Sequence, residues 1–140
     1  MVDLDVLTPL LDGTILPGVT RASCLALLEA HMSQNVELPG IPSTQRLHAH
    51  ELTMTMHDLN SWSAQHKLVE AFLVGTAVIV APVGRIGFEG KDLVMPTESL
   101  GGGLGPVGQA LRERIVDIQT GKVQWNDWSM VIEEIEQHLQ

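Results

Sequence analysis

Tyrosine is absent from this 140-residue sequence, and lysine, phenylalanine and cysteine are rare. The single cysteine, Cys24, excludes an intrachain disulfide and makes a reducing compartment the expected one. Basic residues are also few: eight Lys and Arg stand against 17 Asp and Glu, and the net charge of -9 disfavours binding to nucleic acid. The longest apolar run, residues 73–83, is interrupted by Gly75 and Pro82 and is too short to cross a bilayer.

What is present indicates a folded protein. Hydrophobic residues make up 44% of the chain and charged residues 18%, which is typical of globular proteins. The N-terminal residues carry acid, at Asp3 and Asp5, where a signal peptide carries base, so we expect no secretion signal and a cytoplasmic protein. No repeat or linker divides the sequence, and its length suits one core. We therefore expect a single domain over residues 1–140.

Three segments predict strands. Residues 2–8 alternate between apolar side chains and aspartates, as a half-buried strand does, and residues 45–53 also predict a strand. The Val- and Ile-rich residues 71–83 predict a central strand that is buried on both faces. Residues 89–92, Glu-Gly-Lys-Asp, predict a hairpin turn.

Apolar residues at spacings of three and four predict helices over residues 20–31 and 57–71, with Cys24 in the core. The expected buried stripe of the first helix is Ala22, Leu25, Leu28 and Met32.

A third helix is expected after the glycine cluster at residues 101–105, and Gly121 should end it. Its expected buried face is Val107, Leu111, Ile115 and Ile118. Residues 125–140 fit a strand and a helix equally. The sequence therefore predicts a mixed α/β class.

The segment from Leu11 to Arg21 places a Pro17-Gly18 turn before the first predicted helix. The backbone N–H groups of Val19 and Thr20 would point outward at the positive end of the helix dipole, which is a ready anion site. The same pattern also serves as a plain helix cap, which is the commoner use.

The segment from Glu70 to Ala77 contains a Gly75-Thr76 step inside a strand-like run. Glycine lets the backbone approach a ligand closely, and threonine adds a hydroxyl beside free amides. The alternative is a bulge in a buried strand.

Taken together, the two motifs resemble the branched-chain aminotransferases, pyridoxal-phosphate enzymes of fold type IV. Both family motifs are reproduced, by Thr8-Pro9, Leu16 to Arg21, Glu70, Phe72, Gly75, Thr76 and Ala77. Further matches are Thr55-Met56, Leu59, Pro82-Val83, Gly105-Pro106, Asp117-Ile118-Gln119 and Gly121. The agreement runs from about Thr8 to Trp128 and covers the C-terminal half of the family only.

The resemblance implies a truncated large domain of the fold-type IV fold, with a mixed sheet or partial barrel and flanking helices. It implies that Val19, Thr20 and Thr76 hold the cofactor phosphate, that Leu16 packs on the pyridine ring and that Ala77 faces the substrate carboxylate. Gly18 and Gly75 belong to the same cofactor-binding set. Leu73 and Val74 replace small residues of the family, so we expect them to narrow the substrate site.

Members of that family are more than twice as long as this chain. The resemblance places their Schiff-base lysine in a stretch without a counterpart here, together with the acid that pairs with the pyridine nitrogen. Schiff-base chemistry needs a desolvated amine over the cofactor, whereas Lys67, Lys91 and Lys122 are all expected on the surface. We therefore expect no independent transamination.

His48 and His50 share one face of the strand predicted over residues 45–53, and the family-matched Glu51 lies on the other face. Histidine titrates near neutrality, so this is the best acid–base pair in the sequence. No third ligand has the spacing of a metal site, and no metal is expected. Paired surface histidines are the commoner alternative.

These features favour a repurposed enzyme that needs no cofactor, of cyclase, isomerase or pericyclic type, acting on a small molecule in secondary metabolism through His48 and His50. One alternative is a binding or regulatory module that holds pyridoxal phosphate non-covalently or pairs with a full-length aminotransferase. Another is an inactive remnant. Apolar surface left by the shortened chain predicts a homodimer, with no nucleic-acid or membrane partner.

Overall fold

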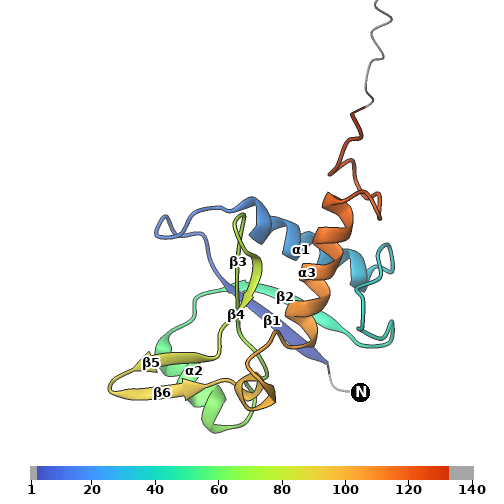
Figure 1. Cartoon of the computed structure of the whole chain (residues 1–140). Coiled ribbons are helices and arrows are strands. Elements are labelled where there is room, and N and C mark those ends of the chain that lie inside the picture. The colour runs from blue at the N-terminus through green and yellow to red at the C-terminus, as the bar shows by residue number, and fades with distance from the viewer. Residues whose placement is uncertain (1–2, 133–140) are drawn as a thin grey trace, which may run out of the picture.

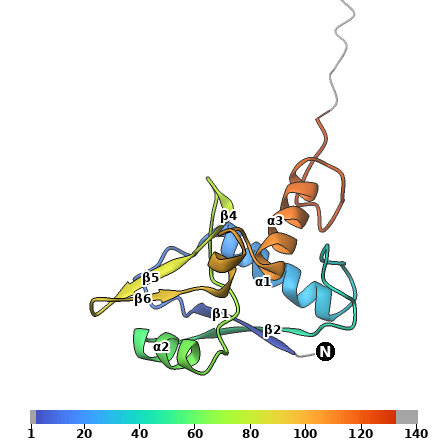
Figure 2. The same cartoon turned by 60° about the horizontal axis from the view of Figure 1, so that its bottom comes forward.

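The computed structural model describes residues 3–132 (Figure 1). Within this part the chain forms three α-helices, one short 3-10 helix and three two-stranded sheets. The predicted mixed α/β class is confirmed. Two groups of elements lie apart in both views: α1 and α3 on one side, and α2 with β5 and β6 on the other (Figures 1 and 2).

The first sheet is a parallel pair of β1 (Leu4–Pro9) and β2 (Leu47–Leu52), aligned from their first residues onward. Both strands lie where the alternation predicted them. Leu4 and Val6 pack against the hydrophobic core, and Leu47 is fully buried. The alternate side chains of the two strands therefore lie on the outer face of the sheet.

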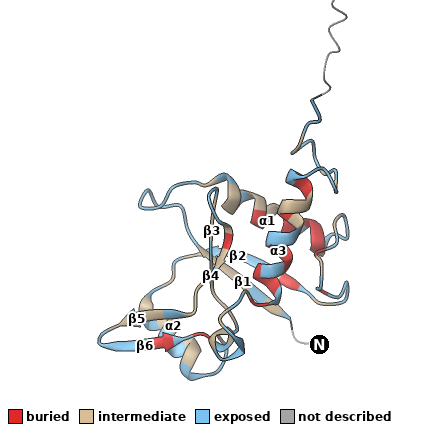
Figure 3. Cartoon of the chain, in the orientation of Figure 1, coloured by how far each residue is buried: buried red, intermediate tan, exposed pale blue. Residues whose placement is uncertain are grey.

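The core lies where α1 (Val19–Met32) and α3 (Pro106–Gln119) pack against each other, β2 and the β3–β4 hairpin. Figure 3 shows most of the buried residues on α1 and α3. The largest fully buried side chains are Leu27, Leu28, Leu38, Leu47, Met95 and Leu111. All four predicted core residues of α3 are buried, and Gly121 follows its last turn with a left-handed φ of 77°.

The expected stripe of α1 is partly wrong. Cys24, Leu27, Leu28, Ala30 and His31 are the buried residues, whereas Ala22 is exposed and Leu25 and Met32 are half-buried. The helix carries apolar side chains over a wide arc, so spacing alone defines two candidate faces. Packing against α3 and β2 selects the face that contains Cys24 and Leu27.

The predicted central strand over residues 71–83 is wrong. The segment is an antiparallel hairpin of β3 (Phe72–Gly75) and β4 (Ile79–Pro82), joined by a turn at 76–78. The first residue of β4, Ile79, has a left-handed φ of 60°. A β-branched residue rarely adopts that conformation, so the sequence carries no turn signal at this position.

The helix predicted over residues 57–71 is shorter, because α2 (Met56–Ala64) ends where His66 takes a left-handed φ of 55°. Its start is a capping box in which the Thr55 hydroxyl accepts from the Asp58 N–H and the Thr55 N–H donates to the Asp58 carboxylate. The Thr55 N–H and hydroxyl both donate to the Asp58 carboxylate, which lowers the pKa of that carboxyl.

The hairpin predicted at residues 89–92 is confirmed. β5 (Arg85–Phe88) and β6 (Lys91–Val94) are joined at Glu89 and Gly90, which both have positive φ, as a tight hairpin turn requires. The short helix η1 (Pro96–Leu100) follows.

The C-terminal residues that the structure describes, 120–132, contain no regular helix or strand. The strand or helix considered for residues 125–140 is therefore absent up to Ile132, and residues 133–140 lie outside the described part. Trp125 packs against the core, and its ring meets that of Trp128 edge-on at 4.5 Å. None of the helices in residues 3–132 is long and apolar enough to cross a membrane.

Candidate functional site

The start of α1 has the features of an anion site. Gly18 precedes the helix in an extended conformation, no side chain caps the helix, and no acidic residue occupies its first turn. The Gly18 N–H donates to the Leu16 carbonyl at 2.8 Å, which tightens the turn before the helix. Val19 is 80% exposed and Thr20 is half-buried. The free N–H groups of the first turn and the helix dipole both favour a negative charge here.

The β3–β4 hairpin, which carries the end of the second motif, packs against this helix, because α1 contacts β3. Thr76, Ala77 and Val78 form the turn and are all exposed. The elements that carry the two motifs, which are far apart in the sequence, are therefore in contact.

Arg21 fixes the start of α1 to the sheet. Its Nη2 atom lies 2.5 Å from Glu51 Oε1 on β2 and donates to the Pro9 carbonyl at the end of β1 at 2.9 Å. The Arg21 side chain is 12% exposed. This family-matched arginine is therefore engaged with the protein, and it positions the helix rather than facing the anion site.

Glu70, also matched in the second motif, caps α3. One oxygen of its carboxylate accepts from the Val107 N–H at 2.8 Å and the other from the Gly108 N–H at 3.4 Å. Burial raises the pKa of Glu70, and these backbone N–H groups oppose the shift. Part of the second motif thus connects the segment before the hairpin to the start of α3.

The remaining residues of the two motifs vary in exposure. Leu16 is 84% exposed and Leu73 63% exposed, whereas Val74 packs against the core. Leu16 and Ala77 are therefore both open to a ligand. Leu73 reaches solvent on the strand before the turn.

His48 and His50 lie on the outer face of the first sheet, and each meets an aspartate of β1 or its flank. His50 Nε2 lies 2.8 Å from Asp5 Oδ1, and His48 Nε2 lies 3.4 Å from Asp3 Oδ2. The two imidazole rings are 6.5 Å apart. Among residues 3–132, no three His, Cys, Asp or Glu side chains are grouped so that they could hold a metal ion.

The sequence analysis did not predict that Asp3 and Asp5 would contact the two histidines. They belong to a segment more than 40 positions away, and only the parallel register of β1 and β2 brings them to the histidines. A signal did exist, because aspartates and histidines both recur with period two, and two such strands can pair face to face.

Sequence comparison places these motifs among known proteins. The chain is 35% identical over 119 residues to branched-chain-amino-acid transaminase 1 of Bacillus subtilis, a match that covers 85% of this chain and 28% of that protein. It is 31% identical over 131 residues to the mitochondrial branched-chain-amino-acid aminotransferase of Saccharomyces cerevisiae, covering 94% of this chain and 30% of the relative. The chain is homologous to one part of the branched-chain aminotransferases.

The Dictyostelium discoideum branched-chain-amino-acid aminotransferase gives a similar match, 33% over 126 residues, covering 89% of this chain and 29% of the relative. The resemblance inferred from the motifs is thus confirmed. This aminotransferase homologue spans about 30% of the length of the curated relatives it matches, which is consistent with their C-terminal part. No protein-family model matches the chain.

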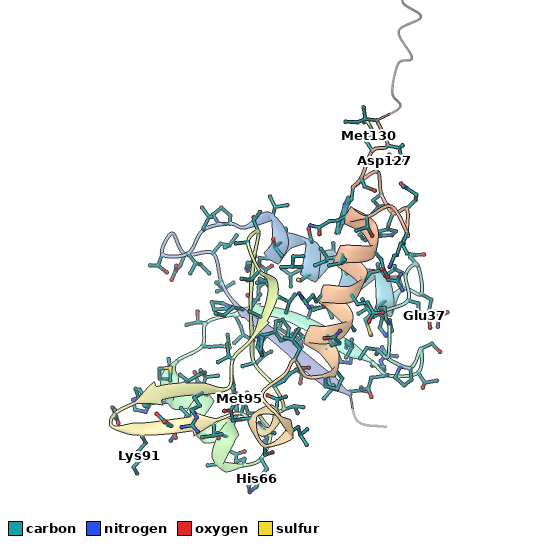
Figure 4. The ribbon with its side chains drawn as sticks, in the orientation of Figure 1. Glu37, His66, Lys91, Met95, Asp127 and Met130 are labelled. Atoms are coloured by element: carbon teal, nitrogen blue, oxygen red, sulfur yellow. The ribbon has the colours of Figure 1, made fainter. Side chains whose placement is uncertain are left out.

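The three lysines of this aminotransferase homologue are all exposed. Lys67 follows α2, and Lys122 lies 3.9 Å from Asp117. Lys91 begins β6, and its side chain points away from the body of the molecule (Figure 4). None of them has the desolvated setting that Schiff-base chemistry needs.

Proposed function

We propose that this chain is a phosphate-binding module of the branched-chain aminotransferase type. In this proposal it holds pyridoxal phosphate non-covalently at the start of α1, and the 140 residues do not transaminate by themselves. The uncapped first turn of α1, a helix that contacts β3, is the observation that supports it most.

The donors at this place suit a phosphate. The N–H groups of Val19 and Thr20, the hydroxyls of Thr20 and Thr76 and the helix dipole all stabilise negative charge. Because the Arg21 guanidinium is already paired with Glu51, these donors are neutral, as in many phosphate sites at helix starts. The exposed Leu16 side chain offers an apolar surface for a flat ring.

When bound, pyridoxal phosphate supplies an electron-withdrawing ring. The residues of this chain bind and orient its phosphate. Covalent chemistry needs a lysine beside the ring, and the exposed Lys67, Lys91 and Lys122 do not provide a desolvated amine. The transaminase activity named for the relatives would therefore require residues beyond these 140.

The proposal is tested by titrating the protein with pyridoxal phosphate and following absorbance, with inorganic phosphate as competitor. Thr20→Val and Thr76→Val should each weaken binding about tenfold, because each removes a donor to a charged group. Thr53→Val, which changes an exposed threonine after β2, is the matched control and should leave the affinity unchanged.

Borohydride treatment followed by mass spectrometry tests the second half of the proposal. We expect no adduct confined to a single lysine. Such an adduct, with a spectral change on adding leucine, would refute the non-covalent mode. Equal affinities of wild type, Thr20→Val and Thr76→Val would refute the binding site.

A second candidate is a cofactor-independent enzyme of cyclase, isomerase or pericyclic type that acts on a small molecule in secondary metabolism. One contact favours it: the carboxylate of Asp5 lies 2.8 Å from His50 Nε2. A carboxylate in that position orients an imidazole, which suits a general base. His48 with Asp3 repeats the arrangement at 3.4 Å.

Deuterium exchange tests this candidate. The protein is incubated in D2O with 4-methyl-2-oxopentanoate, and exchange of the protons beside the carbonyl is followed by NMR. The candidate is supported if wild type accelerates exchange above the rate in buffer alone and if both His50→Gln and Asp5→Asn abolish this acceleration. Exchange at the buffer rate would count against proton transfer to or from this substrate class.

A further inference from the structure

The loop between β1 and α1, blue in Figure 1, contains an aspartate–glycine step that the anion site does not use. Asp12 is the only aspartate or asparagine of the sequence that is followed by glycine. It lies within residues 9–17, all of which are exposed. Because glycine has no Cβ to hinder attack, its backbone nitrogen can react readily with a preceding aspartate side chain. This step is therefore a candidate for chemical rearrangement.

The side chain of Asp12 is folded towards the peptide bond that follows it. Its Oδ1 atom accepts from the Thr14 N–H at 2.9 Å and from the Thr14 hydroxyl at 2.5 Å. Such an Asx turn holds the carboxyl group alongside the Gly13 peptide. Gly13 has a φ of 94°, and no atom of the described residues lies within 4 Å of the position that a Cβ would take. No neighbour of Gly13 therefore blocks a ring that joins the two residues.

The nitrogen that would attack is also free. The Gly13 N–H makes no hydrogen bond within residues 3–132. A bonded N–H must first open locally before its nitrogen can react. By contrast, the N–H after Asp3 donates to the Arg46 carbonyl at 3.0 Å, and the one after Asp58 donates to the Thr55 carbonyl at 3.2 Å. The next N–H is also bonded, or is held in a helix or sheet, after Asp5, Asn35, Asn60, Asp92, Asp117 and Asp127.

Asn126 is the one competitor in the described part of the chain. It precedes Asp127, whose N–H also makes no hydrogen bond there. The side chain of Asp127 crowds its own nitrogen, and its carboxylate opposes loss of the proton from that nitrogen. Gly13 has neither hindrance, so the structure favours Asp12 over Asn126.

We propose that Asp12 is a site of spontaneous isomerisation to isoaspartate. The Gly13 nitrogen attacks Cγ of the protonated carboxyl group and forms a C–N bond. The hydroxyl of that carboxyl leaves with the proton of the nitrogen as water, and a five-membered succinimide ring results. Water then opens the ring at the main-chain carbonyl carbon. The peptide bond to Gly13 now runs through the former side chain, and the main-chain carbonyl has become a carboxylate.

The reaction consumes one water and releases one, so it needs no co-reactant and leaves the mass unchanged. It adds one carbon to the backbone between β1 and α1. The hydrogen bonds from the Thr14 hydroxyl and N–H lower the pKa of the Asp12 carboxyl, so the protonated form that can lose water is scarce near neutral pH. The isomerisation is therefore slow. It uses none of the donors at the start of α1 and stands independently of the phosphate-binding proposal.

The experiment is incubation of the folded protein for weeks at physiological temperature in mildly acidic buffer. Tryptic digestion and mass spectrometry with electron-transfer fragmentation then locate isoaspartate. We expect at least about tenfold more isoaspartate at position 12 than at any other aspartate, because the other nitrogens must first leave a hydrogen bond. Even spread over the aspartates, or none at position 12, would overturn the proposal. So would a main product at Asn126, which the mass gained on deamidation reveals.

Two matched variants separate the glycine from the loop. Gly13→Asn keeps a residue that tolerates positive φ and adds a side chain beside the nitrogen, so it should slow isomerisation about tenfold. Gly90→Asn makes the same change at a glycine with a φ of 74° and equally open surroundings, and should leave the rate at Asp12 unchanged. Equal rates in wild type and Gly13→Asn would overturn the proposal.

Discussion

Among single residues, Cys24 shows most directly how burial sets chemistry. Its side chain is 6% exposed in the core, and burial raises the pKa of the thiol to about 11. Because the thiolate is the reactive form, the native protein should react with iodoacetamide at pH 8 about a hundredfold more slowly than the protein in urea. Equal rates in the two states would contradict this.

The same shift links stability to pH. The folded pKa of about 11 lies above the ordinary thiol pKa of 9.0, so folding favours the protonated thiol. This contribution is complete below pH 9 and is lost as the pH rises towards 11. The free energy of unfolding, measured with urea, should fall over that range in wild type more than in Cys24→Ala.

Residue roles could be predicted from the sequence where a motif specifies them locally. The Pro17-Gly18 turn correctly indicated that a helix follows, predicted from residue 20 and observed from Val19. The contact of Asp5 with His50 and the capping role of Glu70 were not predictable in this way, since both depend on which distant segments meet.

At the scale of elements, Glu70 connects the hairpin to α3. Removing both acceptor oxygens in Glu70→Ala leaves the Val107 and Gly108 N–H groups unpaired and should lower the free energy of unfolding by about 1–2 kcal/mol. Urea denaturation measures the loss.

Glu70→Gln is the matched control. Burial raises the pKa of Glu70, so the stability that this residue contributes through its protonation is complete below its ordinary pKa of 4.5 and is lost as the pH rises through the folded pKa. The neutral glutamine keeps one acceptor and avoids the buried charge. Glu70→Gln should therefore lower the free energy of unfolding at pH 7 by less than Glu70→Ala does. An equal decrease in the two variants would contradict the capping role.

Periodicity in the sequence predicted the type of most elements, and it failed where a residue other than glycine takes a left-handed conformation. Ile79 closes the β3–β4 turn and His66 follows the end of α2, both with positive φ. Sequence rules expect glycine or asparagine at such points, so the hairpin was predicted as one strand and the helix was extended too far. The hairpin at Glu89-Gly90, which has a glycine, was predicted correctly.

For the whole molecule, exposed apolar side chains around the start of α1 and the hairpin predict self-association. Leu16, Val19, Leu73 and Val78 are between 50% and 84% exposed. We expect light scattering to give the mass of a homodimer, twice 15.2 kDa. The dimer should dissociate less in salt, because screening reduces the repulsion between two chains that each carry a net charge of -9. Leu16→Lys with Val19→Lys should give a monomer. A wild-type monomer at every concentration would refute the dimer.

The parallel pairing of β1 with β2 has a consequence for the order of folding. Leu4 lies opposite Leu47, so the pair closes a loop of more than 40 residues that contains all of α1, whereas each hairpin closes within a few residues. Contacts between distant residues form slowly because the loop entropy is lost first. The anchoring of Arg21 on Pro9 and Glu51 depends on that closure. During refolding, helical circular dichroism should therefore return before affinity for phosphate does.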